Sequence, residues 1–118
     1  MELADSAWTL VSFATEMGVI QTRVEVPSTL TFPVEGERTG KLGGNGGCNR
    51  YFADYTLTGN RLSISPLGST RMMCSPAQMA QEARFFQALS TAERYKLNNG
   101  ELLIIYVGGT LRFTPMIP

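Results

Sequence analysis

The chain has 118 residues, and its ten Lys and Arg residues balance ten Asp and Glu residues, so the formal net charge is zero. This length predicts one domain spanning residues 1–118, and the charge balance argues against nucleic acid, which needs a basic surface. The sequence contains no histidine. This absence excludes His-dependent catalytic triads and dyads and removes the commonest transition-metal ligand.

Short β-strands dominate the first half of the predicted structure. Residues 29–34 alternate in polarity, with Leu30, Phe32 and Val34 on one face. Gly59-Asn60 is a two-residue hairpin signal between two further alternating segments. We expect strands over 8–14, 19–26 (or an extended loop there), 29–34, 51–58 and 61–65.

One segment has helical periodicity instead. Ser75 is a suitable N-cap, Pro76 follows at the first helical position, and Gln78 completes a capping box. The pattern predicts a helix over about 76–89 with one apolar face. We expect Met79, Ala83, Phe86 and Leu89 to face the core, and Gln81, Glu82, Gln87 and Ser90 to face away.

After the helix, strands are expected over 94–98, 102–107 and 110–114, separated by glycine-containing turns. Together these elements predict a mainly β (α+β) fold, a small antiparallel β-barrel or half-barrel of about 7–8 strands. The one helix would close an opening of the barrel or cover one face.

Four glycines surround Asn45 in the segment 43–47, which leads directly into Cys48. Such density predicts a sharp turn, and Asn49 is expected to cap backbone groups of that turn. The only other cysteine is Cys74. We favour a structural disulfide between Cys48 and Cys74, with two reduced thiols as the alternative; a redox or zinc role is disfavoured because the spacing and the missing histidines do not suit it.

These motifs resemble the META domain, or HslJ-like, family, named after a heat-inducible bacterial protein. The resemblance covers residues 8–113. It rests on Trp8, Leu10, the run Gly47-Cys48-Asn49-Arg50-Tyr51, Tyr55, the run Thr70-Arg71-Met72-Met73-Cys74, Phe86, Leu89, Leu111 and Phe113.

The resemblance implies a compact barrel-like domain with one helix, located in the bacterial cell envelope and linked to stress or drug tolerance. Members often carry an export signal or a lipid anchor that tethers them to the membrane. The N-terminal residues 1–5 have neither the basic nor the apolar region of such a signal. A cytoplasmic location is therefore the alternative to the envelope.

Five residues are candidates for a ligand or partner surface: Arg50, Arg71, Met72, Met79 and Phe85. The two arginines could form an anion site if the cysteines pair, or they could be solvated surface charges. Met72, Met73 and Met79 could line an apolar groove, since methionine adapts to irregular shapes, or could fill the core under the helix.

We expect a monomeric, non-enzymatic domain without a cofactor, which binds an unknown protein partner or a small apolar ligand. A second hypothesis is a lipid or acyl-chain carrier, by similarity of shape to pilot proteins of secretion systems. A small hydrolase is the third, but the carboxylates share no motif that would bring two of them together.

Overall fold

A computed structural model describes residues 6–22, 27–32 and 39–116. Its elements are β1 (Ser6–Thr15), β2 (Gly18–Gln21), β3 (Thr29–Phe32), β4 (Thr39–Asn45), β5 (Arg50–Thr58), β6 (Arg61–Ile64), β7 (Gly68–Ser69), α1 (Pro76–Ser90), β8 (Ala92–Asn98), β9 (Glu101–Tyr106) and β10 (Gly109–Pro115).

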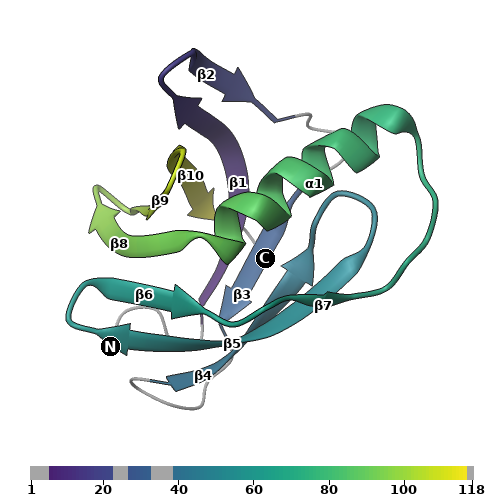
Figure 1. Ribbon diagram of the computed structural model, residues 1–118. Coiled ribbons are helices and arrows are strands. Elements are labelled where there is room, and N and C mark those ends of the chain that lie inside the picture. The colour runs from purple at the N-terminus through teal and green to yellow at the C-terminus, as the bar shows by residue number, and fades with distance from the viewer. Residues whose placement is uncertain (1–5, 23–26, 33–38, 117–118) are drawn as a thin grey trace.

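Eight strands form a closed antiparallel barrel, which confirms the predicted fold class. Neighbours around the barrel are β1, β3, β4, β5, β6, β8, β9 and β10, and β10 pairs with β1 to complete the circle (Figure 1). The two short strands lie outside this circle, β2 beside β1 and β7 beside β5.

The long strand β1 pairs with β10 along one edge and with β3 and β2 in turn along the other, and it has a bulge in its middle. The register with β10 shifts between Leu10 and Ser12, and such a bulge bends the strand. Residues before the bulge pair with β3, whereas those after it pair with β2. Expected strand residues 23–26 and 33–34 lie outside the described residues.

The barrel interior is filled with large apolar side chains. The alternation predicted for residues 29–32, 55–57 and 62–64 is confirmed, since the expected inward residues are buried. An eight-stranded barrel is just wide enough for side chains to fill it. The most completely buried large residues are Phe13, Phe32, Tyr55, Phe85 and Phe113, together with Leu10, Leu30, Leu62, Leu89, Leu102 and Ile104.

The helix α1 lies across one opening of this barrel (Figure 1). Its predicted capping box is present: Ser75 accepts a hydrogen bond from the Gln78 N–H, and the Gln78 side chain accepts one from the Ser75 N–H. Within the described residues, no helix has both the length and the apolar character needed to cross a membrane.

The predicted apolar face of the helix is partly wrong. Leu89 is buried as expected, but Ala83 is exposed, and Glu82 is buried although it was expected to face away. The inward stripe is Glu82, Phe85, Ala88 and Leu89. The helix is therefore rotated from the expected orientation, and the cause is the partner that Glu82 finds in the glycine-rich turn.

Candidate functional site

The glycine-rich segment begins as a strand and ends as a tight turn. Residues 43–45 belong to β4, and the turn itself is formed by residues 46–49, closed by a hydrogen bond from the Gly46 N–H to the Asn49 carbonyl. A Cβ atom on Gly46 would lie 2.5 Å from the Phe86 ring and 2.9 Å from Glu82 Cγ. The glycine is needed here because the helix packs directly on the turn.

The carboxylate of Glu82 binds the backbone of this turn. Its Oε2 accepts hydrogen bonds from the N–H groups of Cys48 (2.9 Å) and Asn49 (2.5 Å), and its Oε1 accepts one from Asn49 Nδ2 (2.9 Å). Three donors satisfy one buried anion, which is the condition for burying a charge without large loss of stability. The turn is thus an anion cradle, but its anion comes from the protein itself.

Asn49 connects the turn to the segment that precedes the helix, rather than capping the turn as expected. Its Oδ1 accepts hydrogen bonds from the Met72 N–H (2.6 Å) and the Thr70 hydroxyl (2.9 Å), and its Nδ2 also donates to the Met72 carbonyl. The side chain that does cap the turn is Asn45, whose Oδ1 accepts from the Gly47 N–H. Asn49 therefore fixes the backbone of Met72 on both sides.

Cys48 and Cys74 form a disulfide, with their Cα atoms 6.0 Å apart. Cys48 is buried in the glycine-rich turn, and Cys74 lies immediately before the helix cap. The bond and the Asn49 side chain together hold the segment 70–74 against the turn.

A shallow groove of about 380 Å³ lies between this segment and the first turns of α1. We call it the methionine groove; its apolar lining is Met72, Met73, Met79, Ala83 and Phe86, with Thr70 and Arg71 among its polar residues. Met72 is 55% exposed and Met73 is 84% exposed. The alternative in which these two methionines fill the core is therefore wrong, whereas Met79 is half-buried at the helix.

Arg50 and Arg71 lie in adjoining hollows rather than in one shared site. Both are exposed; Arg71 lines the methionine groove, whereas Arg50 lines a neighbouring hollow of about 450 Å³. Thr70 borders both hollows, and its backbone N–H donates to the Arg50 carbonyl.

The assignment of Phe85 to this surface is wrong. Its side chain is fully buried and packs against the rings of Tyr51 (5.7 Å between ring centroids) and Phe113 (6.2 Å). The next residue, Phe86, takes the expected position in the groove. The error follows from Glu82: the helical pattern predicts that this polar residue faces solvent, but its buried partner is distant in the sequence.

Among residues 6–22, 27–32 and 39–116, no group of three Cys, Asp or Glu side chains could hold a metal ion. The chemistry offered by the site is therefore apolar contact, one guanidinium group and backbone polar groups.

Two solved structures have the same fold. An NMR structure of a protein from Burkholderia xenovorans is 27% identical, covers 98% of this chain and 85% of its own, and superposes with a TM-score of 0.82. A second NMR structure is 23% identical, covers 96% and 91% of the two chains, and has a TM-score of 0.70. No curated protein matches the sequence.

The family comparison agrees with the motifs in the sequence. The model of the META domain matches residues 1–116, nearly the whole chain. The Cys48–Cys74 bond joins the two motifs on which the resemblance rests. The chain belongs to the META domain family.

Proposed function

We propose that this envelope-type domain acts by binding, and that the methionine groove receives a small apolar ligand carrying an anionic group. META domains are associated with the bacterial envelope. Large buried side chains of the described residues occupy the barrel interior, so we place the ligand outside it. The groove beside the helix is the better candidate.

The observation that carries the proposal is the rigid presentation of exposed methionines. The side chains of Met72 and Met73 are exposed, so they can change rotamer freely. The backbone that carries them is fixed by Asn49 and by the disulfide. A fixed backbone with flexible thioether side chains suits ligands of varied shape. Arg71 adds a positive charge, which favours an anionic group on the ligand.

A fluorescent probe with both properties, 1-anilinonaphthalene-8-sulfonate, tests this proposal. We expect saturable binding to the folded domain, and about tenfold weaker binding after Met72→Ser together with Met73→Ser, since each exposed side chain loses apolar contact with the probe. Arg71→Gln should weaken binding of the sulfonate but not of an uncharged naphthalene.

Met17→Ser is the matched control, because Met17 is 96% exposed in the turn between β1 and β2. Equal weakening by Met17→Ser and by the groove variants would reject the groove. A lipid that co-purifies in native mass spectrometry would instead favour the pilot-like carrier. A role in stress or drug tolerance is then tested by whether the wild-type domain, but not the Met72→Ser and Met73→Ser variant, restores tolerance in a deletion strain.

A further inference from the structure

The strands β6 and β8 form a short seam in the barrel wall. The two strands pair at Arg61 and Arg94, supported by a hydrogen bond from the Tyr95 N–H to the Asn60 carbonyl. On its other side β8 has an extra residue, Glu93, relative to β9. Such a bulge bends a strand and increases its twist. Beyond Arg61 the strands diverge, and an opening of about 690 Å³ lies between them.

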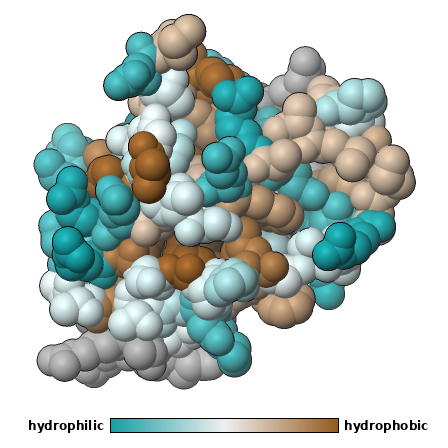
Figure 2. Space-filling view, viewed as in Figure 1, coloured by the Kyte–Doolittle hydropathy of each residue, from teal (hydrophilic) through white to brown (hydrophobic). Residues whose placement is uncertain are grey.

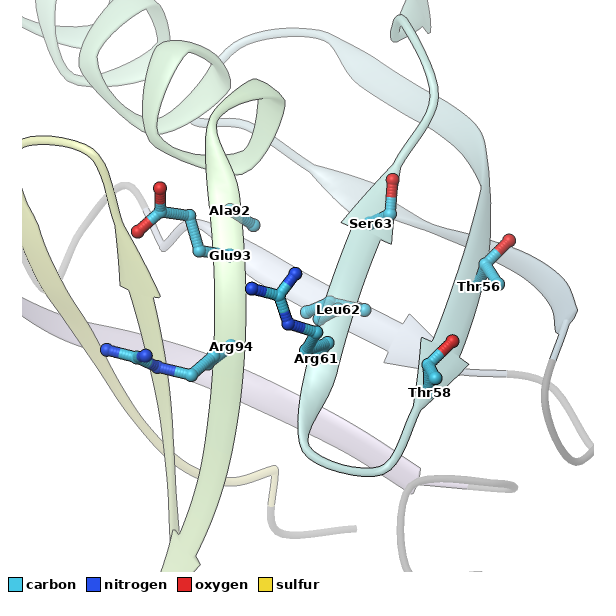
Figure 3. A pocket seen from close by; sticks show the side chains of 8 residues that line it. All are labelled: Thr56, Thr58, Arg61, Leu62, Ser63, Ala92, Glu93 and Arg94. Carbon is cyan, nitrogen blue, oxygen red and sulfur yellow. The ribbon is translucent and has the colours of Figure 1, made fainter.

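Hydroxyl groups and a guanidinium group line this opening. Figure 3 shows the Arg61 side chain in the space between β6 and β8, whereas Arg94 extends on the other side of β8. The hydroxyls of Thr56, Thr58 and Ser63 lie on the exposed face of β5 and β6. In the space-filling view, the region below the helix is hollowed, with apolar atoms at its floor (Figure 2).

A second hollow, of about 750 Å³, adjoins the first at Arg94 and includes Lys96. Arg94 and Lys96 are two positions apart on β8, and both are exposed. Alternate residues of a strand share a face, so both side chains belong to one face of the barrel wall. Arg61, Arg94 and Lys96 together make this wall positive. We call the three cations and the hydroxyls of Thr56, Thr58 and Ser63 the seam face.

Of the described acids, Glu93 alone lines either of these two hollows. Asp54 is paired with Lys41, Glu101 with Arg112, and the Glu82 carboxylate with backbone N–H groups. The acid on the seam face is Glu93, whose carboxylate is directed away from Arg61 (Figure 3).

Arg61 and Arg94 also stand directly opposite each other in the register of the sheet. Their guanidinium groups nevertheless extend to different sides of β8 (Figure 3), and the described ion pairs involve neither of them. Each guanidinium can therefore bind a separate negative group of a ligand.

We propose that the seam face binds a ligand carrying phosphate groups. Arg61 binds one phosphate through its planar fork of N–H donors, Ser63 and the two threonines donate hydroxyl hydrogen bonds, and Arg94 with Lys96 binds a second negative group. This site is separate from the methionine groove, so neither proposal depends on the other. The phosphate could belong to a soluble metabolite or to a lipid headgroup.

Pyrophosphate, followed by ¹H–¹⁵N NMR at constant ionic strength, is the first probe. We expect the largest shift changes at the amides of residues 61–63 and 93–96 and at the Arg61 Nε–H. Arg61→Gln together with Arg94→Gln should weaken binding about tenfold or more, since each charged hydrogen bond lost has that order of effect. Glu93→Gln should tighten binding, because it removes a negative charge from the lining of the opening.

Arg84→Gln is the control, because Arg84 is an exposed arginine of the helix that stacks over Phe13; it should leave binding unchanged. Glycerol phosphate and vesicles containing phosphatidylglycerol, each tested on the same variants, distinguish a free phosphate from a lipid headgroup. Shifts spread equally over all exposed arginines, or loss of binding in Arg84→Gln as large as in the seam variants, would overturn the proposal. So would binding restricted to a DNA oligonucleotide.

Discussion

Tyr51 places its phenol inside the protein, where the hydroxyl donates a hydrogen bond to the Thr29 carbonyl (2.6 Å). Only 3% of the residue is exposed, and its ring contacts those of Phe85 and Phe86. Burial raises the pKa of this hydroxyl far above its ordinary value of 10.0, because the phenolate would be poorly solvated. The residue is therefore both a packing anchor for the helix and a group that must stay protonated.

This raised pKa predicts loss of stability in alkali. Above pH 10 the unfolded chain releases the Tyr51 proton while the folded chain keeps it, so the unfolded state binds fewer protons and the free energy of unfolding falls as pH rises. The slope for one such group is about 1.4 kcal/mol per pH unit. Urea denaturation at pH 9, 10 and 11 measures it.

Tyr51→Phe serves as the comparison. It should be less stable than the wild type at pH 7, because the Thr29 carbonyl loses its donor, but its stability should fall less steeply above pH 10. Burial also raises the pKa of Tyr106, although the charge of Arg84 lowers it, and Tyr106 is less buried than Tyr51. Parallel slopes for the wild type and Tyr51→Phe would show that Tyr51 ionises without unfolding.

At the scale of elements, the helix is held to the β4–β5 turn by a polar contact as well as by its apolar stripe. Glu82 reaches from the middle of α1 to three N–H donors, and Gln78 donates to the Gly47 carbonyl. This contact also sets which helical residues face the core. Phe85 is one turn after Glu82 and enters the barrel, whereas Met79 and Ala83 border the groove.

Glu82→Gln tests the contact with minimal change in shape. The N–H groups of the new glutamine amide would face Asn49 Nδ2, which is also a donor. The Asn49 side chain is held in this orientation by its hydrogen bonds to the segment 70–72. We expect a loss of about 1–3 kcal/mol in the free energy of unfolding and faster hydrogen exchange at the Cys48 and Asn49 amides. Glu16→Gln, at an exposed turn, should change stability by less than about 0.5 kcal/mol. If the two variants are equally stable, the carboxylate does not anchor the helix.

For the whole molecule, the sequence predicted what depends on near neighbours. The Gly59-Asn60 hairpin, the Ser75 capping box and the alternation in β5 are local patterns, and all three are present. The barrel class followed from the number and spacing of such strands. The number of strands in the closed barrel could be estimated but not fixed, because the pairing of β1 with β10 joins the two ends of the chain.

The candidate site was predicted less well because it is made by distant contacts. The burial of Glu82 depends on a turn 33 residues earlier, and this contact moved Phe85 from the predicted surface into the core. Met72 and Met73 are exposed because the disulfide and Asn49 hold their segment at the surface. One signal in the sequence could have indicated this arrangement. It is an acidic residue in the helix, one turn before Phe85, in a chain that also contains a glycine-rich turn whose N–H groups need acceptors.

The disulfide acts on the unfolded state of the whole chain, which gives the last prediction. It joins residues 26 positions apart, and closing a loop of that length lowers the entropy of the unfolded chain by an amount worth about 3.5 kcal/mol in stability. Reduction, which adds about 2 Da to the intact mass, should lower the free energy of unfolding by that order.

Cys48→Ala and Cys74→Ala each break the same bond, so the entropic account requires nearly equal losses. Cys48 is more buried than Cys74; a much larger loss for Cys48→Ala would instead assign the stabilisation to packing in the turn. A negligible loss in both variants would mean that Glu82 and Asn49 hold the segment without the bond.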